Sequence, residues 1–543
     1  MLSLLHKEIP TSSNANLVRI NEFHYISRCS CGHGVEISEY KSLRAEVGYW
    51  RKMHEKAISR EHRLKKQVEE LEAKVRLREK QLFGKKNEKY GAKSEQNKPA
   101  KTEKKSRGHQ KGAEGHGRQA NKELPIREEI VNIASADCFC SNCGLPFEKF
   151  PGTEDSTILE VEIKAHKRCV KRVRYKKTCK CNKGIVTAPA AKRLIPKGKI
   201  GVSIWAYALL DKFHYYNPTY RMLRKLKGCG LTIPQGTVTD GFKKLKPIFA
   251  PVYEAICEYN RQENHWHADE TRWKIFEEKE DKLGYNWYLW VFRSKTTVAF
   301  IVDPSRSAKV IEGHLQEAKG IISCDRYVAY KAFAKQALII LAFCWAHVRR
   351  DFLDHGKSWP KQESWSMKWV EAIGELYHIN NARLRLDFGS TKYQAATKKL
   401  KEAAVKMEQN YLEQLSGKLH PASRKVLESL KNHWTGLTIF LDNPDIPMDN
   451  NKGENSLRGP VTGRKSFYGS GCQWSGELAA YQFSILQTLE LWGINLHNWM
   501  TRFLTACANN DRELPKDWEN NFLPWNMGKE RLDDLSVILK DTS

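Results

Sequence analysis

Alternating and helical patterns of hydrophobic positions divide the centre of the chain into short strands and helices. Period-two alternation predicts three consecutive strands, at His265–Ile275, Trp287–Arg293 and Thr297–Val302. Further elements follow them: a helix at Ala308–Glu317, a strand from Gly320 that ends at Asp325, a helix opened by Tyr327, and an apolar strand at Ala337–Cys344. The pattern therefore predicts a mixed domain, in which an antiparallel meander is followed by strands separated by helices.

Helical periodicity dominates on both sides of this domain. Before it, apolar residues repeat at spacings of four and three, with Arg78 interrupting the seam: Leu64, Val68, Leu71, Val75 and Leu82. This short pattern fits a coiled coil of two chains and equally a helix packed on its own protein. After the strands, from about Asp351 to Leu441, leucine and alanine periodicity with a lysine-rich surface predicts a helical segment.

Another helical stretch, from Gly201 to about Tyr259, has the shape of a helix-turn-helix. A helix is expected at Arg221–Lys227, a turn from Gly228 to Pro234, and a second helix at Gln235–Leu245. Side chains at the start of the second helix, such as Gln235 and Thr239, could then reach base edges of DNA. Many helical hairpins have this shape without touching DNA, so both interpretations stay open.

The charge balance of the chain points to a polyanionic partner. The 543 residues carry a formal net charge of +28, and the segment from Ile163 to Leu210 holds fourteen Lys or Arg and no Asp or Glu. The segment from Lys85 to Leu124 is polar and lysine-rich, with almost nothing to bury, which predicts a basic linker able to lie along phosphates. Nucleic acid is the expected partner.

The sequence has neither the pattern of a secretory signal peptide nor an apolar run long enough for a transmembrane helix. The first residues, MLSLLHKEIPTS, lack the pattern of a signal peptide, and the longest apolar run, Ala337–Ala346, is well short of the ~20 residues that span a bilayer. We therefore expect a soluble intracellular protein. In a reducing compartment, its fourteen cysteines are zinc ligands or buried thiols rather than disulfides.

A cluster of cysteines precedes the helical stretch. Cys140 and Cys143 have the two-residue spacing of a zinc knuckle, and Gly144 permits the tight turn that follows. Further cysteines that could complete four thiolates lie nearby: Cys138, Cys169, Cys179 and Cys181. The alternative is a set of free thiols in a β-hairpin.

Three acidic residues are candidates for metal chemistry. Asp269 lies on the first predicted strand, where His265, His267 and Thr271 share its face and Trp266, Ala268 and Glu270 take the other. Asp325 ends a later strand. Glu454 lies on a helix that should start at Pro447 or Asp449 and stop at Gly459 and Pro460, with Asn450 or Asn451 and Arg458 on its face. Such carboxylates can hold two Mg²⁺ ions, or Mn²⁺, for phosphodiester chemistry.

Five motifs in order make the chain resemble a known family, the DDE transposases of the insertion sequence sixty-six type. They are HADETRW, CDRYVAYKAF, CWAHVRRDF, DNNKGENSLRGPVTGRKSFYGSG and LQTLELWGINLHNWMTRFL, and the resemblance covers most of the chain from about Leu43. It implies a ribonuclease H-like catalytic core in which Asp269, Asp325 and Glu454 are the catalytic metal ligands. One residue departs from the family pattern, because Asn455 stands where the family usually has Arg.

The resemblance also implies a structural zinc ion. Its ligands carry over to Cys140, Cys143, Cys179 and Cys181, although the last pair has one intervening residue where the family usually has two. Cys138 or Cys169 may substitute for a member of that pair. Cys344 and His347 of CWAH could also bind metal, but their apolar flank favours a place in the core.

The expected fold is multidomain, α+β with an α/β core, and its segments run in a fixed order. They are a mobile N-terminal extension (1–42), a coiled-coil-like helix (43–84), a basic linker (85–125), a zinc-binding DNA-binding domain (126–198), a helix-turn-helix-like region (199–262), the ribonuclease H-like core (263–350 and 445–492), a helical insertion (351–444) and a C-terminal helical segment (493–543).

The expected function is metal-dependent cleavage and strand transfer of DNA at the ends of an insertion sequence. DNA contacts are expected from the following residues: Arg172, Arg174, Lys176, Lys177, Gln235, Thr239, Arg349, Arg350, Arg458, Arg464 and Lys465. The expected partners are double-stranded DNA of the element ends and the target, further copies of the chain, and small accessory proteins of the same element. A cytoplasmic, nucleoid-associated location follows from that substrate. The alternatives are a structure-specific nuclease of the same fold and a non-catalytic, zinc-dependent DNA-binding regulator.

Overall fold

The computed structural model describes residues 17–20, 23–26, 37–83, 130, 132, 134–148, 164–176, 185–278 and 284–536. The chain divides into two compact units. One comprises Met1–Lys93 with Phe352–Trp369, and the other comprises Ser94–Asp351 with Val370–Ser543. The predicted basic linker, Lys177, Cys179 and Cys181 lie outside the described residues.

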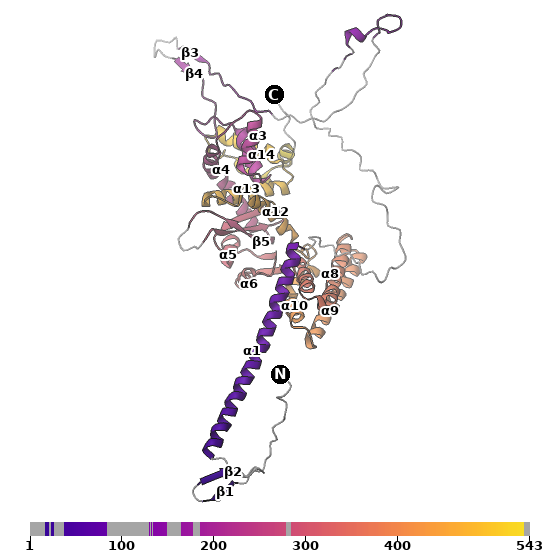
Figure 1. Ribbon diagram of the computed structural model, residues 1–543. Coiled ribbons are helices and arrows are strands. Elements are labelled where there is room, and N and C mark those ends of the chain that lie inside the picture. Colours follow the sequence, from indigo (N-terminus) through magenta and orange to yellow (C-terminus); the bar gives the residue numbers. More distant parts are fainter. Residues whose placement is uncertain are drawn as a thin grey trace. The chain divides into compact units, whose positions relative to one another are not determined.

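The first unit is dominated by one long helix, α1, Ile37–Phe83 (Figure 1). It begins six residues before the predicted start, and two short antiparallel strands, β1 (Leu17–Ile20) and β2 (Phe23–Ile26), precede it. The seam residues of α1 remain exposed, Leu64 by 47% and Leu71 by 59%. The predicted apolar repeat is therefore an uncovered stripe within the described part of this unit.

A five-stranded mixed sheet forms the centre of the second unit. Its strands are β5 (His265–Lys274), β6 (Asn286–Arg293), β7 (Val298–Asp303), β8 (Gly320–Cys324) and β9 (Ile339–Phe343). The order across the sheet is β7-β6-β5-β8-β9, with β5, β6 and β7 antiparallel and β5, β8 and β9 parallel. The predicted meander and the later strands are confirmed to within two residues at nearly every boundary.

The period-two pattern of β5 is also confirmed by what each face packs against. Trp266 and Ala268 are buried in a cluster with residues of α5 (Ala308–Leu315) and α6 (Val328–Ala334). On the other face, Trp273 belongs to a larger core that includes residues of α4, α12 and α13. Helices thus cover both faces, which accounts for strands that are apolar on both sides.

The helix-turn-helix prediction is confirmed in its elements but wrong in one length. After α2 (Val202–Phe213), α3 (Thr219–Gly228) is followed by α4, which runs from Gln235 to Gln262 instead of ending at Leu245. Residues on one side of the extension, such as Phe249 and Val252, are buried, while Pro247 is exposed. Packing of this apolar stripe keeps the helix continuous through its prolines.

The predicted insertion is helical throughout most of its length. Its elements are α7 (Trp345–Ser358), η2 (Pro360–Gln362), α8 (Glu363–Arg383), α9 (Thr391–Ser416), α10 (Pro421–Asn432), α11 (Trp434–Leu437) and η3 (Ile439–Leu441). The chain then forms α12 (Asn451–Phe467), α13 (Gln473–Leu491), α14 (Leu496–Asn509), α15 (Trp518–Phe522), η4 (Pro524–Asn526) and α16 (Lys529–Ser536).

The predicted end of the helix that carries Glu454 is wrong, because α12 continues through Pro460 to Phe467. A proline inside a helix leaves the carbonyl four residues earlier without its amide donor. Here that carbonyl, of Ser456, accepts a 2.9 Å hydrogen bond from Gln487 Nε2 on α13. A neighbouring helix thus replaces the lost bond.

The turn after α12, in which Gly469 and Gly471 flank Ser470, is anchored to β5. Ser470 N donates to Lys274 O at 2.8 Å, and Trp273 Nε1 donates to Ser470 Oγ at 3.0 Å. Gly469 has φ +130°, and a Cβ there would collide with the Lys274 carbonyl oxygen. The turn is therefore hydrogen-bonded and closely packed against the sheet where α12 ends.

Ahead of the helices, the cysteine region contains short elements. The described ones are η1 (Ser135–Asp137) and the antiparallel pair β3 (Arg174–Lys176) and β4 (Ile185–Thr187). Among the described residues as a whole, no helix is long and apolar enough to cross a membrane.

Candidate active site

Asp269 lies in the middle of β5, on the central strand of the sheet. Its Oδ1 accepts a 2.8 Å hydrogen bond from the amide of Glu270. Burial, the neighbouring charge of Glu270 and the charges of Asp325 and Glu454 raise the pKa of Asp269 to about 8. Asp325 and Glu454 are therefore both close enough for their charges to act on Asp269, as expected of clustered metal ligands.

Asp325 follows β8, the strand beside β5. His267 pairs with Ser323 in this parallel ladder, so continuing both strands by two residues brings Asp325 level with Asp269. Asp325 Oδ1 accepts a 2.8 Å hydrogen bond from the amide of Tyr327, just before α6. That bond fixes the carboxylate at the end of its strand.

Glu454 comes from the first turn of α12, where a carboxylate is favoured by the helix dipole. Its amide donates to Asn450 O at 3.1 Å. Asn450 in turn contacts β5, because its Nδ2 donates to Ala268 O at 2.7 Å. The structure thus brings a residue from the far side of the helical insertion to the strand of Asp269.

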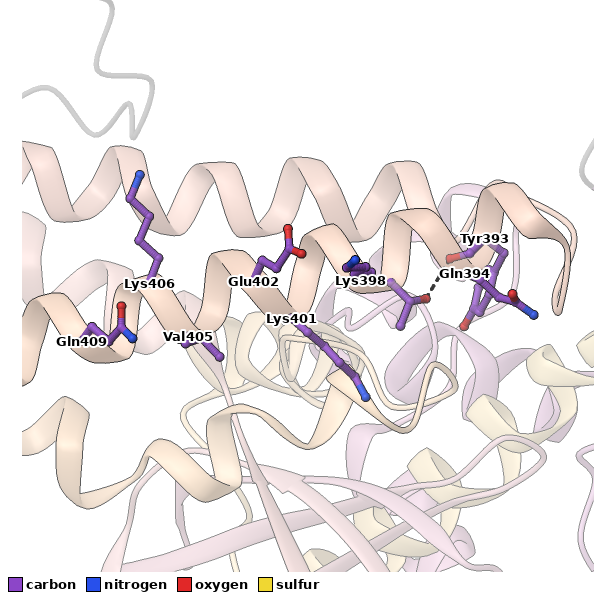
Figure 2. A pocket seen from close by; sticks show the side chains of 9 residues that line it. Tyr393, Gln394, Lys398, Lys401, Glu402, Val405, Lys406 and Gln409 are labelled. Carbon is purple, nitrogen blue, oxygen red and sulfur yellow. Dashed lines mark hydrogen bonds between the residues drawn. The ribbon is translucent and has the colours of Figure 1, made fainter.

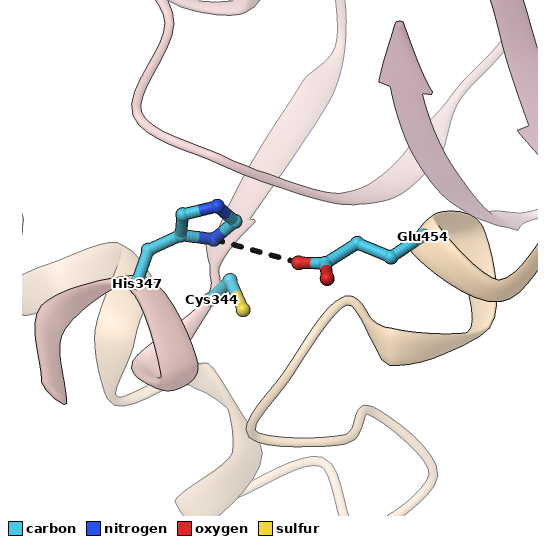
Figure 3. Close-up of side chains that lie close together, drawn as sticks. All are labelled: Cys344, His347 and Glu454. Atoms are coloured by element: carbon cyan, nitrogen blue, oxygen red, sulfur yellow. Dashed lines mark ion pairs between the residues drawn. The ribbon is translucent and has the colours of Figure 1, made fainter. Parts of the chain in front are cut away.

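Glu454 also faces His347, on the first turn of α7 (Figure 3). Glu454 Oε1 and His347 Nδ1 are 3.8 Å apart, and neither atom has a hydrogen-bond partner among the described residues although both are buried. Cys344 Sγ completes a group whose three ligand atoms all lie within 4.8 Å of one another. These side chains could hold a metal ion.

The expected core position is thus confirmed for Cys344, which is buried, but not for His347. The apolar residues that flank His347 are typical of a core position, which hides its place beside Glu454 from the local sequence. The available signal was position: β9 lies parallel to β8, so residues that follow β9 gather at the edge where Asp325 follows β8.

A second group that the sequence did not reveal surrounds Glu270. Tyr330 Oη donates to Glu270 Oε2 at 2.7 Å, and Arg306 Nε donates to Oε1 at 2.9 Å. The Arg306 guanidinium lies 3.9 Å from the ring centroid of Tyr327. A half-exposed cation therefore lies beside the acidic cluster, from a loop in which no site residue was predicted.

Histidines on the Asp269 face of β5 lie in a poorly solvated environment. His267 Nδ1 donates to Asn450 Oδ1 at 3.1 Å, and His265 Nε2 is 2.9 Å from Ser323 Oγ. Burial is the main cause that lowers the pKa of His267 to about 3 and that of His265 to about 4. Both rings are neutral at physiological pH and act here as hydrogen-bonding groups.

Four of the cations predicted to contact phosphate near the carboxylates are at least partly exposed, and a fifth, Arg464, is hydrogen-bonded within the protein. Arg350 on α7 and both Arg458 and Lys465 on α12 are exposed, and Arg349 is half-buried. Arg464 instead donates to Thr271 Oγ1 at 3.0 Å and to the carbonyl of Arg272. Its guanidinium holds α12 against β5.

Other residues predicted to contact DNA lie on elements away from the carboxylates. Those that the structure describes are exposed. Gln235 and Thr239 occupy the first turns of α4, with Thr239 Oγ1 donating to Gln235 O at 3.2 Å. Arg174 and Lys176 lie on β3, and Arg172 precedes it, with Nε donating to Ala188 O at 2.6 Å. None of these is placed near Asp269 by a contact within the described residues.

Cys140 and Cys143 form a tight turn of the kind that the knuckle spacing predicts. Gly144 N donates to Cys140 O at 2.8 Å, and Gly144 has φ +75°. Hydrogen bonds from the amides of Asn142 and Cys143 lower the pKa of the Cys140 thiol. These contacts favour a thiolate, the form that binds zinc.

A separate hollow of about 640 Å³ lies along α9 (Figure 2). It contains none of the predicted site residues. Its lining comes from that one helix: Tyr393, Gln394, Thr397, Lys398, Lys401, Glu402, Val405, Lys406 and Gln409.

The chain is similar to known proteins over about three quarters of its length. The chain is similar to two proteins of Sinorhizobium fredii (strain NBRC 101917 / NGR234), both named as uncharacterized. It is 26% identical to y4jD over 75% of this chain and 81% of that protein, and 25% identical to y4hP over 74% and 75%. The family model described as Transposase IS66 family matches residues 197–478, more than half of the chain, with Asp269, Asp325 and Glu454 inside the match. The chain therefore belongs to the IS66 family of transposases.

Proposed function

We propose that this transposase cuts and rejoins DNA at the ends of its own insertion sequence, with Asp269, Asp325 and Glu454 as ligands of two divalent metal ions. The observation that carries the proposal is the convergence of three elements: β8 pairs in parallel with β5, which brings Asp325 level with Asp269, and Asn450 bonds the start of the Glu454 helix to β5. The raised pKa of Asp269, to which the charges of both other carboxylates contribute, is consistent with this geometry. Acidic groups gathered from three separate elements at a cost in charge repulsion are typical of a metal site.

The donor set suits Mg²⁺ or Mn²⁺. All three groups offer hard carboxylate oxygens, which these ions prefer. Glu454 Oε1 is buried and has no hydrogen-bond partner among the described residues, so a cation would satisfy it. When bound, two such ions polarise the phosphodiester and favour ionisation of the attacking oxygen.

The chain's own residues hold and orient these groups. Backbone amides of Glu270 and Tyr327 fix one oxygen each of Asp269 and Asp325. The exposed cations Arg458 and Lys465 of α12 are suited to phosphate oxygens of the DNA. Arg349 and Arg350 take the same role from α7, whereas Arg464 supports α12 through its bonds to β5.

The sheet supports a ribonuclease H-like core. Three antiparallel strands followed by two parallel ones, with helices on both faces, are the arrangement expected for that fold. In this proposal the core comprises residues 263–350 and 445–492, and the helical insertion 351–444 contributes DNA contacts. The C-terminal helices from 493 onward complete the core's packing.

The front half of the chain would bind DNA. A structural zinc ion held by Cys140, Cys143, Cys179 and Cys181 would order the segment 126–198, with the knuckle turn supporting this. The exposed stripe of α1 would join copies of the chain on DNA. A cytoplasmic, nucleoid-associated location and small accessory proteins of the same element belong to the same proposal.

DNA affinity and DNA specificity would reside in different segments. Neutralising the cations around β3 (Arg172, Arg174, Lys176 and Lys177) should weaken binding to element ends and random DNA alike. Each lost phosphate contact should flatten the slope of log affinity against log salt by about 0.9. Changing Gln235 and Thr239 should lower the preference for element ends at nearly constant slope, because only base contacts read sequence. An effect of the first set on element ends alone would contradict this division.

The central experiment measures cleavage and strand transfer on DNA that carries the element's ends. Changing Asp269, Asp325 or Glu454 to Ala should each abolish cleavage and leave DNA binding nearly intact. Asp303→Asn is the control, because Asp303 lies on β7 and its carboxylate accepts a hydrogen bond from the nearby Ser305 amide. A Glu454→Ala protein that still cuts would refute the assignment.

The same experiment separates the alternatives. Cut products that are never joined to target DNA would favour a structure-specific nuclease. Binding without metal-dependent cleavage in the wild type would favour a non-catalytic regulator.

A further inference from the structure

We propose that Asn450 is a positioning residue that holds Glu454 in register with the strand of Asp269. The inference rests on the proposed function, because it gives Glu454 its role as a metal ligand. Asn450 touches none of the reacting atoms and would act through the helix that follows it. Its side chain and its backbone both contribute.

The side chain of Asn450 connects α12 to β5. It is 1% exposed. Nδ2 donates to Ala268 O at 2.7 Å, and Oδ1 accepts from His267 Nδ1 at 3.1 Å. These partners are the two residues that precede Asp269. One amide group therefore hydrogen-bonds to both the backbone and a side chain of the strand that carries Asp269.

The backbone of Asn450 connects Glu454 to the end of β9. Asn450 O accepts the amide of Glu454 at 3.1 Å, and Asn450 N donates to Cys344 Sγ at 3.2 Å. Cys344 directly precedes α7, whose first residue donates from Trp345 N to Met448 O, just ahead of α12, at 2.9 Å. Cys344 therefore ties the starts of α7 and α12 together.

These contacts explain why asparagine suits the position. A buried site that must donate to one carbonyl and accept from one imidazole requires both halves of an amide. Aspartate would present an oxygen to the Ala268 carbonyl, and alanine would leave both partners unsatisfied. The space is also limited, because a Cβ at Gly453 would lie 3.0 Å from Asn450 Oδ1.

A residue that orients a metal ligand differs measurably from one that only stabilises the fold. Loss of groups that orient metal ligands typically weakens metal affinity 10–100-fold. Asn450→Ala should therefore weaken Mn²⁺ binding to the full-length protein by about that factor, measured by calorimetry and by electron paramagnetic resonance of free Mn²⁺. Cleavage should show a matching rise in the Mn²⁺ concentration for half-maximal rate.

The chain offers a close control in Asn260. It is also fully buried; its Nδ2 donates to Phe292 O at 3.1 Å and its Oδ1 lies 2.9 Å from His314 Nε2. Asn260→Ala removes the same kinds of bond away from the carboxylates. It should lower the melting temperature but leave Mn²⁺ affinity within about twofold, well below the loss expected when a ligand is misoriented.

Equal Mn²⁺ affinity in Asn450→Ala and wild type, or equal losses in Asn450→Ala and Asn260→Ala, would overturn the proposal. If Asn450→Ala does not fold, His267 decides: His267→Asn keeps an N–H donor for Asn450 Oδ1 and should bind Mn²⁺ nearly as wild type, while His267→Leu should lose affinity. Similar affinities for those two variants would also overturn it. A wild-type protein whose Mn²⁺ binding does not depend on Asp269 would instead refute the proposed function itself.

Discussion

Binding of a divalent metal at the three carboxylates should release a proton at neutral pH. Burial, the charge of Glu270 and the charges of Asp325 and Glu454 raise the pKa of Asp269 to about 8 in the metal-free protein. Metal binding requires the deprotonated carboxylate. With that pKa, Asp269 carries about 0.9 proton at pH 7, so about that number should be released when metal binds.

The metal affinity should depend on pH in the same way. It should fall close to tenfold for each pH unit below about 8 and level off above, so the change between pH 9 and pH 6 is roughly 100-fold. Glu270→Gln removes the charge that contributes most to the shift and should move the midpoint to lower pH. Asp303 is not among the groups that shift Asp269, so Asp303→Asn should leave the midpoint unchanged.

Calorimetric titration with Mn²⁺ in buffers of different ionisation enthalpy counts the released protons directly. The slope of apparent enthalpy against buffer enthalpy should be close to one at pH 7 and approach zero at pH 9.5. A slope near zero at pH 7, or a Glu270→Gln midpoint that does not move, would show that Asp269 is already ionised. The neighbouring carboxylates would then be too far from Asp269 to raise its pKa.

Protonation of Asp269 should also make the stability of the metal-free protein depend on pH. The folded-state pKa of Asp269 lies above the ordinary aspartate value of 3.8, so the unfolded chain loses this proton near pH 4 while the folded chain keeps it to about pH 8. The contribution of Asp269 to the free energy of unfolding is therefore fully present below about pH 4 and decreases as pH rises toward 8. Thermal unfolding in chelator should show this trend, and Asp269→Asn should remove it.

Three further outcomes test other parts of the molecule. Gln487→Ala should lower the free energy of unfolding by about 1–3 kcal/mol, measured by urea titration, because the carbonyl freed by Pro460 loses its donor; no change would mean that water replaces the amide. Leu64→Asp combined with Leu71→Asp should lower the mass measured by light scattering to that of a monomer, since both leucines are exposed on the α1 seam through which copies of the chain are proposed to pair; an unchanged mass would exclude a coiled coil. Metal analysis should find one zinc ion per chain, lost in Cys140→Ser, and a protein that keeps its zinc would remove this thiol from the site.

Hydrophobic periodicity along the chain was enough to determine most of the elements. The strands of the sheet were predicted nearly to the residue because each alternates against packed helices, as Trp266 and Ala268 do on one face of β5. The same period predicted that Asp269 faces away from that cluster. Local turn chemistry likewise predicted the Cys140 knuckle, since Gly144 adopts the positive φ that it requires.

Where the structure differs from what the local sequence predicts, the cause is contact with a segment distant in the sequence. Pro460 should end a helix, yet α12 continues because Gln487, far along the sequence, donates to the freed carbonyl. Ser470 sits in a glycine-flanked turn that should be loose, but Trp273 and Lys274 bind it. Local sequence cannot reveal such partners, because they exist only once the helices pack.

The assembly of the candidate site was likewise decided only by tertiary structure. Asp269 and Asp325 meet because β5 and β8 pair in a parallel register, which the order of strands along the chain does not specify. His347 and Asn450 gained their positions beside Glu454 from the packing of α7 and α12 at the edge of the sheet. Sequence alone determined which residues carry acidic, thiol and cationic chemistry, since these follow from residue type and short spacing. The folded chain decided which of them act on one another, because charge interaction and hydrogen bonding require a few ångströms of separation that hundreds of residues of chain leave unspecified.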